Sequence, residues 1–332
     1  MKAAIVGIAG PELTSGERAL FRVCPPAGVI LFARNIAAPL QLAELVADLR
    51  RVLPAGAVIA VDQEGGRVAR LRPPHWLGHP PAGAIGARFL ADAAAGLRAA
   101  WLTGALIGAQ CLRAGFDVVC APVLDVRAPG SSDVVGDRAF GETDSAVARL
   151  GRAAAQGLLA GGVQPVMKHA PGHGRARVDS HTALPRVDAN DLERDFSPFR
   201  LNMDIPWAMT AHILYTGLDP DQPATLSPLV IGRVIRGMMG FDGVLVSDDL
   251  AMGALNGAPA ARAAAALAAG CDLALYCPGD AAGTEAVLRA CTDVTSPAAA
   301  RLRRARALAA ARRLPLDPAR LAASRDLALG TA

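Results

Sequence analysis

Residues 162–181 read Gly162-Val163-Gln164-Pro165-Val166-Met167-Lys168-His169-Ala170-Pro171-Gly172-His173-Gly174-Arg175-Ala176-Arg177-Val178-Asp179-Ser180-His181. The apolar first part, up to Met167, is typical of a short buried strand. The remainder, residues 168–181, holds three histidines, a lysine and an aspartate, and we call it the histidine loop. Its Pro171, Gly172 and Gly174 prevent a helix or strand from continuing, so a mobile loop is predicted at the strand end. Such a concentration of titratable groups indicates a functional site.

Apolar runs of this kind recur along the chain. Eight are predicted to be strands: Ala3–Ile8, Gly28–Phe32, Val58–Val61, Phe116–Ala121, Val163–Met167, Trp207–Ala211, Gly243–Val246 and Leu273–Tyr276. The segments between them carry helical patterns, for example over 39–53, 88–114, 144–160, 227–239 and 259–269. Ser227 and Pro228 are suited to start a helix, and Gly270 to end one. Apolar strands that alternate with helices indicate a parallel sheet covered on both faces.

Eight strand–helix units favour a closed (β/α)8 barrel over an open doubly wound sheet. Polar residues follow most of the predicted strands, and they are Asp62, Asp125, Lys168, His212, Asp248 and Asp249. Barrel enzymes build their active sites at this carboxyl-terminal face, although a single strand-end aspartate is often only a helix cap. We therefore predict an α/β protein with one TIM-type barrel domain over residues 1–332. Its helical tail starts at about residue 297 and is expected to pack as one more helix.

The composition limits the possible partners. The net charge is only +4, from 34 basic and 30 acidic residues. The densest basic run, at residues 301–313, lies in an alanine-rich helical pattern without interleaved aromatic residues. It is predicted to be a solvated helix face and not a nucleic-acid site. No apolar stretch is long enough to span a membrane, so we expect neither a nucleic-acid nor a membrane partner.

The compartment is predicted from the cysteines and from the amino terminus. The six cysteines are scattered without a CxxC pair, which is typical of reduced, buried thiols in a cytosolic protein. The segment Met1–Ile8 has one charge and a short apolar run, and Pro11 and Glu12 follow without a cleavage pattern. It is predicted to be a first strand and not a signal peptide. We therefore expect a cytoplasmic protein, and a monomer.

Two parts of the chain carry candidate catalytic groups. Asp179 and His181 would share one side of an extended backbone, where the carboxylate orients the imidazole for general acid–base work. Ser180 would then face away from both, which argues against a serine-protease triad, and no G-x-S-x-G elbow occurs. The alternative is that both groups are solvated bystanders. Asp248 ends a predicted buried strand, where a carboxylate must be hydrogen-bonded or functional. Because adjacent side chains point to different sides, one aspartate of the pair Asp248 and Asp249 can face the cavity while the other caps the next turn.

Several basic residues lie in glycine-containing segments after predicted strands. Arg67 and Arg70 follow Asp62-Gln63-Glu64-Gly65-Gly66, and Arg138 lies in Gly136-Asp137-Arg138-Ala139-Phe140-Gly141. They can bind carboxylate or hydroxyl groups of a ligand, or form salt bridges across the barrel mouth.

Four segments together resemble the motifs of family 3 glycoside hydrolases, and in particular its single-domain bacterial β-N-acetylhexosaminidases. The segments are Val61–Val68, Gly136–Gly141, the histidine loop, and Ser247-Asp248-Asp249-Leu250-Ala251-Met252. They occur in the order of the family, and the resemblance runs from Gly7 to about Met252. Ala170 stands where an aromatic residue is common, and Arg175 and Arg177 add charge to the loop. Neither departure affects a matched catalytic position.

The resemblance implies a role for each matched residue. Asp248 matches the nucleophile, His181 the general acid/base and Asp179 the partner that tunes it. The residues that match the first sugar subsite are Asp62, Arg70, Arg138, Lys168 and His169. The implied activity is release of terminal β-linked N-acetylglucosamine, with retention and through a covalent glycosyl-aspartate, without a cofactor or metal. The implied substrates are N-acetylglucosaminyl-anhydro-muropeptides, which are trimmed in the cytoplasm during peptidoglycan recycling.

The implied mechanism differs from the common glycosidase pattern, in which two carboxylates share the work. Here a histidine takes the role of the general acid/base. Because 332 residues leave little room for another domain, we expect this histidine to come from the barrel's own loops. Three alternatives stay open. A metal-dependent hydrolase would use His169, His173, His181 and Asp179 as ligands, although their spacing matches no standard zinc motif. A non-catalytic sugar-binding protein would not need the candidate catalytic groups. A Schiff-base aldolase would use Lys168.

Overall fold

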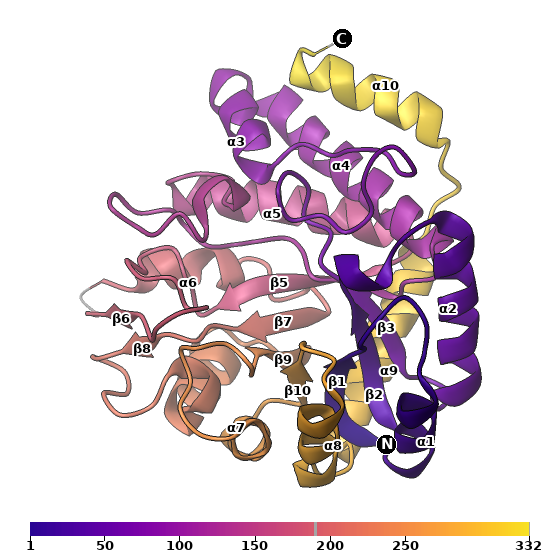
Figure 1. The fold of residues 1–332 in the computed structure, drawn as a ribbon. Coiled ribbons are helices and arrows are strands. Elements are labelled where there is room, and N and C mark those ends of the chain that lie inside the picture. Colours follow the sequence, from indigo (N-terminus) through magenta and orange to yellow (C-terminus); the bar gives the residue numbers. More distant parts are fainter. Residues whose placement is uncertain (189–190, 332) are drawn as a thin grey trace.

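The computed structural model describes residues 1–188 and 191–331, and its centre is a closed barrel of eight parallel strands (Figure 1). Around the barrel the strands are β1 (Lys2–Gly7), β2 (Pro26–Leu31), β3 (Val58–Val61), β4 (Val118–Val119), β5 (Gln164–Ala170), β7 (Trp207–Thr210), β9 (Val244–Asp249) and β10 (Leu273–Tyr276). β10 pairs in parallel with β1 and so closes the ring. The predicted (β/α)8 fold is confirmed. A separate two-stranded sheet consists of β6 (Arg186–Val187) and β8 (Leu214–Tyr215).

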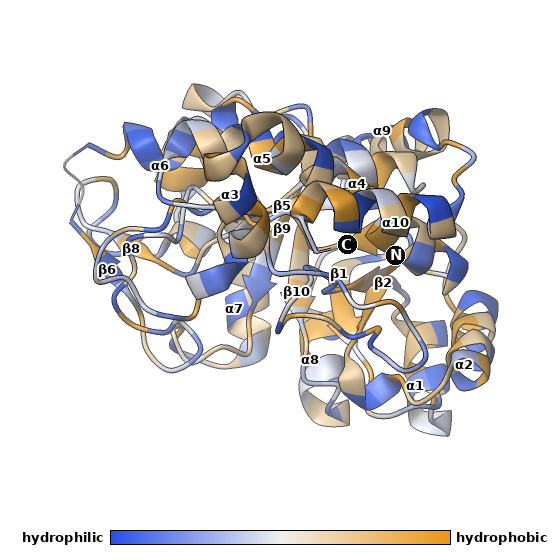
Figure 2. Ribbon diagram, turned by 90° about the horizontal axis from the view of Figure 1, so that it is seen from above, coloured by the Kyte–Doolittle hydropathy of each residue, from blue (hydrophilic) through white to orange (hydrophobic). Residues whose placement is uncertain are grey.

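Side chains along the strands alternate between two cores. One core fills the barrel and includes Ile5, Ile30 and Leu275. The other lies between the barrel and the helices and includes the neighbouring residues Val6 and Val29. Because successive strand residues point to opposite faces, an unbroken apolar run supplies both cores at once. Figure 2 shows this pattern, with apolar residues concentrated along the central strands and mixed colours on the surrounding helices.

The helices surround the barrel, and several begin and end where the sequence predicts. The α-helices are α1 (Ser15–Val23), α2 (Pro39–Val52), α3 (Ala82–Ala91), α4 (Ala93–Arg113), α5 (Asp144–Ala160), α6 (Glu193–Arg200), α7 (Pro259–Ala269), α8 (Ala281–Ala290), α9 (Ser296–Arg312) and α10 (Pro318–Leu329). Short 3₁₀ turns lie at η1 (Ala33–Asn35), η2 (Gly136–Arg138) and η3 (Ala224–Leu226). Gly270 ends α7 with a φ of +116°, as expected for a glycine cap.

Two helices differ from the prediction. The segment expected as one helix over 88–114 breaks at Asp92, whose carboxylate accepts hydrogen bonds from the N–H groups of Ala94 and Ala95 and starts α4. The segment expected over 227–239 forms the π-helix η4 (Val230–Met238). Ser227 Oγ accepts from the N–H of Val230 at 3.0 Å, which confirms its predicted capping role.

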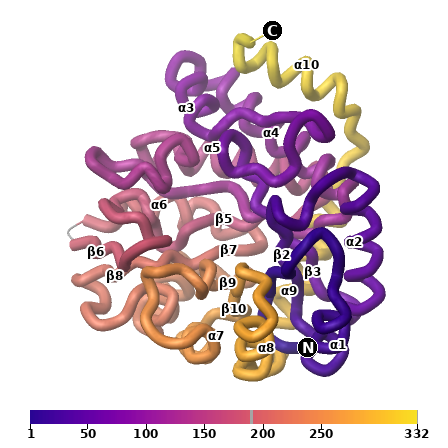
Figure 3. Tube along the Cα trace, viewed as in Figure 1, coloured from indigo at the N-terminus to yellow at the C-terminus, as the bar shows by residue number. Residues whose placement is uncertain are grey.

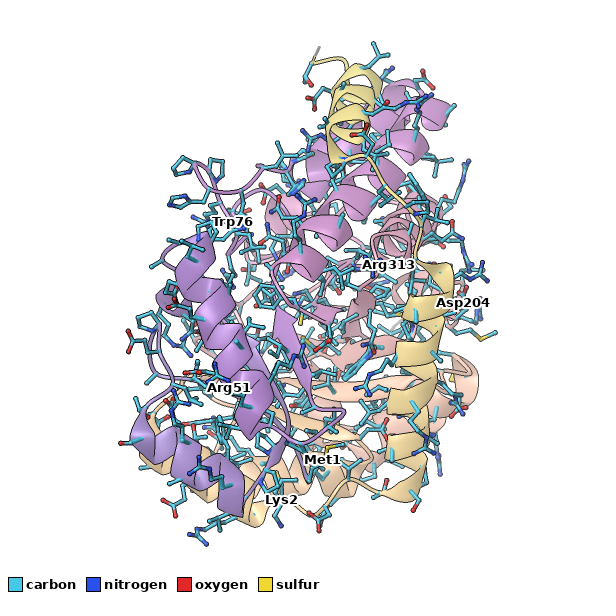
Figure 4. All side chains as sticks on the ribbon, turned by 90° about the vertical axis from the view of Figure 1, so that its right-hand side faces the viewer. Met1, Lys2, Arg51, Trp76, Asp204 and Arg313 are labelled. Atoms are coloured by element: carbon cyan, nitrogen blue, oxygen red, sulfur yellow. The ribbon has the colours of Figure 1, made fainter. Side chains whose placement is uncertain are left out.

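The carboxyl-terminal tail forms two helices where one was expected. Pro315 lies between them, and Asp317 starts α10 by accepting from the N–H groups of Ala319 and Arg320. α10 packs on α4, and the two ends of the chain lie at opposite ends of the molecule (Figures 1 and 3). Arg313 is at the point where α9 ends (Figure 4).

The basic run on α9 has a structural role. Arg301 pairs with Asp242 and Asp272 at 2.9 Å each, Arg304 pairs with Asp242, and Arg306 donates to the carbonyl oxygen of Gly56. These partners lie just before β9, β10 and β3, so α9 lies across the amino-terminal end of the barrel. Arg304 and Arg306 are nevertheless exposed, so the predicted solvated face is confirmed for them and is wrong only for Arg301, whose side chain is 21% exposed. No described helix is both long and apolar enough to cross a membrane.

Helices α4 and α5 pack so closely that glycines are needed between them. A Cβ atom on Gly104 would lie 2.2 Å from the carbonyl oxygen of Ala154. We expect Gly104→Ala to lower the free energy of unfolding by about 2 kcal/mol, because the overlap outweighs the roughly 1 kcal/mol that alanine adds in helix propensity. Urea denaturation measures this change. Gly232→Ala is the matched control, since no atom lies within 4 Å of that Cβ position. Equal stability of the two variants would contradict the close packing.

Candidate active site

A cavity of about 310 Å³ opens at the carboxyl-terminal ends of the barrel strands. Inward-facing strand residues Ile30, Met209 and Leu275 contribute its apolar lining. Seven of the eight candidate site residues line it, namely Asp62, Arg70, Arg138, Lys168, His169, His181 and Asp248. The eighth, Asp179, is bonded to His181. The fold thus brings together residues that lie up to 186 positions apart in the sequence, since Asp62 and Asp248 line the same cavity.

Lys168 joins two carboxylates inside the cavity. Its Nζ lies 3.0 Å from Asp62 Oδ1 and 2.6 Å from Glu64 Oε1, and its side chain is only 3% exposed. Burial opposes the charge of Lys168, but Asp62 and Glu64 outweigh that effect and raise the pKa of the ammonium group. Lys168 is therefore fully charged, which does not suit the neutral amine that a Schiff-base aldolase requires.

Glu64 also binds Arg138, so one carboxylate holds two cations. Arg138 Nε and Nη2 donate to the two Glu64 oxygens at 2.8 Å each, in a bidentate pair. Burial would raise the pKa of Glu64, but Lys168 and Arg138 lower it to about 2. The turn after Glu64 contains Gly65 with a φ of +100°, where a Cβ atom would lie 2.3 Å from the carbonyl oxygen of Pro80. Glu64 is not among the residues predicted for the site, although it belongs to the quoted Val61–Val68 motif.

Arg70 and Arg67 differ in their surroundings. Arg70 Nη2 lies 3.2 Å from Asp62 Oδ2, and its guanidinium lies over the ring of Phe32 at 5.4 Å from the ring centre. Arg67 bonds Asp137 at 2.9 Å and donates to carbonyl oxygens of residues 133–135. Arg67 therefore forms the salt bridge across the mouth that the sequence offered as an alternative, while Arg70 lies further inside.

Asp125, in the loop that follows β4, organises the start of the histidine loop. Its Oδ2 lies 2.7 Å from His169 Nδ1, and its Oδ1 accepts from the backbone N–H groups of His169 and His173 at 3.1 and 2.7 Å. Burial would raise the pKa of Asp125, but His169 and the donated N–H groups lower it to about 2. Since an ionised carboxylate only accepts, we assign the Nδ1 proton to His169. Asp125 was predicted only as a strand-end residue.

Asp248 and Asp249 both line the cavity. Asp249 Oδ1 also accepts from the N–H groups of Ala251 and Cys277 at 3.0 Å each, so Asp249 is the member of the pair that holds the following turn. The carbonyl oxygen of Asp249 accepts from His212 Nε2 at 2.9 Å, which holds the backbone beneath Asp248. Burial opposes ionisation of Asp248, but His169, His212 and the N–H of Asp249 together lower its pKa. The Asp248 carboxylate is therefore ionised and available at neutral pH.

Asp179 and His181 form a pair at the cavity rim. His181 Nδ1 and its backbone N–H lie 2.7 and 2.8 Å from Asp179 Oδ1. The predicted extended backbone is wrong: the N–H of Thr182 donates to the carbonyl oxygen of Asp179 at 3.0 Å, so the segment is a turn. A short polar residue such as Asp179 favours a turn by binding N–H groups two residues on. Ser180 points inward, and its Oγ lies 3.1 Å from His173 Nε2.

The histidines do not group as the metal-dependent alternative requires. His169 binds Asp125, His173 binds Ser180 and His181 binds Asp179. Among residues 1–188 and 191–331, no three His, Cys, Asp or Glu side chains are arranged to hold a metal ion. The arrangement gives this alternative no geometric support.

The contribution of the Glu64 carboxylate to the stability of the protein can be tested. Glu64→Gln should lower the free energy of unfolding by about 3 kcal/mol, because two buried cations lose their shared counter-charge. The pKa of Glu64 is lowered from 4.5 to about 2, so its contribution is complete above pH 4.5 and is lost as the pH falls toward 2. The variant should therefore lose less stability than the wild type across this range in pH-dependent urea denaturation. Glu285→Gln, in an exposed pair with Arg289, is the control. Identical acid profiles for wild type and Glu64→Gln would refute the assignment.

Comparisons with known proteins show the family of the chain. The model of the glycosyl hydrolase family 3 N-terminal domain matches residues 18–307. A β-hexosaminidase of Methylococcus capsulatus is 43% identical over 281 residues, which cover 81% of this chain and 81% of that protein. A β-hexosaminidase of Pseudomonas aeruginosa is 40% identical over 309 residues, covering 91% and 90% of the two chains.

A solved structure is similar over the whole chain. NagZ from Neisseria gonorrhoeae, in complex with N-trifluoroacetyl-D-glucosamine, has a TM-score of 0.86 and 30% sequence identity. The match covers 100% of this chain and 98% of that one. The chain therefore belongs to the family 3 glycosyl hydrolases, and within that family to the NagZ-type β-N-acetylhexosaminidases.

Proposed function

We propose that the protein is a retaining exo-β-N-acetylglucosaminidase that works through a covalent glycosyl-aspartate. One observation carries this proposal: an ionised carboxylate, Asp248, and a carboxylate-bound imidazole, His181, line the same cavity. A nucleophile and a separate proton donor are the two groups that retaining glycoside hydrolysis needs. The coarser activity, hydrolysis of β-N-acetylhexosaminides, is that of the group to which the chain belongs.

In the first step, one Asp248 carboxylate oxygen attacks the anomeric carbon of the terminal sugar. The bond from that carbon to the aglycone oxygen breaks, and His181 gives its Nε2 proton to the leaving oxygen. Asp179 accepts from His181 Nδ1, so the other ring nitrogen, Nε2, is the one that exchanges the proton. The products of this step are the free aglycone alcohol, the glycosyl ester of Asp248 and a neutral His181.

In the second step, neutral His181 takes a proton from a water molecule, and the water oxygen attacks the anomeric carbon. The ester bond to Asp248 breaks and the carboxylate is regenerated. Two inversions give the β-anomer of N-acetylglucosamine, and His181 ends the cycle with its proton restored. Burial raises the pKa of Asp179, but the hydrogen bonds from His181 outweigh it and lower the pKa, so Asp179 stays ionised throughout.

The sugar itself is bound by the alternating charges inside the cavity. We assign this role to Asp62, Arg70, Lys168, His169 and Arg138. Carboxylates accept from sugar hydroxyls, and the cations donate to hydroxyl and acetamido oxygens. Arg138 uses three of its N–H groups on Glu64 and the carbonyl oxygen of Val134, which leaves two for a ligand. The existing pairs hold these groups in position before the sugar arrives, which reduces the entropy cost of binding.

We further propose that the substrates are N-acetylglucosaminyl-anhydro-muropeptides, met in the cytoplasm during peptidoglycan recycling. We also propose that residues 1–332 act as one catalytic domain and as a monomer. The motif resemblance and the similarity to NagZ support these statements. Release of N-acetylglucosamine from a purified anhydro-muropeptide, followed by mass spectrometry, tests the substrate. Size-exclusion chromatography with light scattering tests the monomer.

The reaction is tested with p-nitrophenyl β-N-acetylglucosaminide. We expect hydrolysis that is unchanged by a chelator, with the β-anomer of the sugar as the first product seen by ¹H NMR. Activity that disappears with chelator and returns with metal would favour the metal-dependent alternative. An α-anomer as first product would show an inverting reaction. Binding of the sugar without any turnover would favour the non-catalytic alternative.

A further inference from the structure

Ser180 is the buried member of an otherwise exposed segment. The side chains of His181 and Asp179 are 62% and 42% exposed, whereas Ser180 as a whole is only 2% exposed. All other residues from 177 to 183 are exposed or half-buried. Serine is usually found at the surface, and a buried hydroxyl needs a hydrogen-bond partner. Ser180 therefore anchors the segment that carries the acid/base pair.

The partner of Ser180 is itself held in place. His173 Nε2 lies 3.1 Å from Ser180 Oγ, and the His173 backbone N–H donates to Asp125 Oδ1 at 2.7 Å. The His173 ring is 5.6 Å, centre to centre, from the ring of His169, which Asp125 also binds. Asp125 is fully buried and His173 is 3% exposed. A continuous chain of contacts thus runs from Asp125, in the loop after β4, through His173 to Ser180.

The backbone of the same segment is bound from the opposite direction. The carbonyl oxygens of Ser180 and His181 accept from the N–H groups of Ala254 and Gly253, each at 3.1 Å. Residues 253–254 belong to the loop that follows β9, the strand that carries Asp248. Ser180 therefore lies where the start of the histidine loop and the loop after Asp248 meet. Its side chain contacts the former, and its carbonyl group contacts the latter.

From this geometry we infer that Ser180 is a positioning residue, whose hydrogen bond to His173 places the Asp179–His181 pair over the bond to be cleaved. The inference rests on the acid/base role proposed for His181. It adds a role for the contacts that run from Asp125 through His173 to Ser180. These contacts support the proton donor His181 without any of them having to bind the substrate. Because a misplacement of about 1 Å can reduce a rate by about 100-fold, one hydroxyl is enough to affect catalysis.

The test compares a substrate that needs a proton donor with one that does not. Methyl β-N-acetylglucosaminide has a poor leaving group that requires protonation, whereas p-nitrophenolate leaves without it. We expect Ser180→Ala to lower kcat/KM for the methyl glycoside by about 30-fold and for the p-nitrophenyl glycoside by less than about 3-fold. The melting temperature should change little. Val178→Ala, in the same exposed segment, is the matched control and should leave both values unchanged.

A double-mutant cycle separates positioning from a general structural role. If Ser180 acts through His181, Ser180→Ala has no further effect on the methyl glycoside in a His181→Ala background. Independent, multiplicative losses would overturn the inference, as would equal losses on both substrates. If His181→Ala itself shows no preference between the substrates, the proposed role of His181 fails instead. Should Ser180→Ala fold poorly, Ser180→Cys replaces it, since cysteine keeps the size of serine but is a weak hydrogen-bonding group.

Discussion

Replacing Asp248 with asparagine is expected to lower kcat on p-nitrophenyl β-N-acetylglucosaminide by about 10⁴-fold or more. The amide keeps the shape of the side chain but lacks the anionic oxygen that attacks the anomeric carbon. The loss should appear in kcat and kcat/KM together, because the missing bond forms only as the transition state is reached. The loss of activity should be large even for a substrate with a good leaving group, because the nucleophile is needed for every leaving group.

Two further measurements make this result specific to Asp248. Binding of N-acetylglucosamine to Asp248→Asn, measured by calorimetry, should stay within about tenfold of wild type, because Lys168, Asp62 and Arg70 are intact. Asp204→Asn, at an exposed carboxylate, should have wild-type activity. A kcat within tenfold of wild type for Asp248→Asn would mean that another group is the nucleophile.

Replacing His181 with alanine is expected to reduce kcat/KM by about 10² to 10⁴-fold on substrates with poor leaving groups. The proton donor to the leaving oxygen is lost, and its effect grows as the leaving group becomes more basic. On p-nitrophenyl β-N-acetylglucosaminide the loss in kcat/KM should be small. Its kcat should still fall, because hydrolysis of the glycosyl-enzyme also needs His181 as a base.

Azide provides a control for this interpretation. It attacks the glycosyl-enzyme without a general base, so it should raise the kcat of His181→Ala on the p-nitrophenyl substrate and yield the β-glycosyl azide. The wild type should respond little. Equal losses across leaving groups, with no response to azide, would place His181 outside the acid/base role.

The barrel could be predicted from the sequence because its signals are local. Apolar runs such as Val58–Val61 and Leu273–Tyr276 supply both cores of the barrel, and the structure contains strands at those places. Departures arose where a side chain competes with the backbone pattern. Asp92 interrupts an otherwise continuous alanine-rich helix by capping the next one, and periodicity alone gives no sign of this.

The site was only partly predictable, for a different physical reason. Residues that belong to family motifs, such as Asp248 and His181, could be named from the sequence. Interactions between motifs could not, because they depend on the closed barrel. Glu64 meets Arg138 across 74 positions, and Lys168 meets Asp62 across 106. Nothing in the local sequence around Glu64 indicates that it will hold two cations.

The hydrogen bond between Ser180 and His173 was missed for a similar reason. An extended backbone would have turned Ser180 away from the Asp179–His181 pair and toward no defined partner. The turn that Asp179 starts instead directs Ser180 inward, to a histidine whose position depends on Asp125 in the loop after β4. Asp179 and His181 lie two residues apart in the sequence, whereas the residues that hold their segment in place, His173 and Asp125, lie further away.

The covalent intermediate is the central claim, and it can be trapped. His181→Ala is mixed with 2,4-dinitrophenyl β-N-acetylglucosaminide, whose leaving group needs no proton, so the glycosyl-enzyme forms but hydrolyses slowly without its base. Intact-protein mass spectrometry should show one added N-acetylhexosaminyl group, and peptide mapping should locate it on Asp248. Continued turnover without an adduct would indicate attack by the substrate's own acetamido group, and an adduct on another residue would identify a different nucleophile; either result would contradict the mechanism.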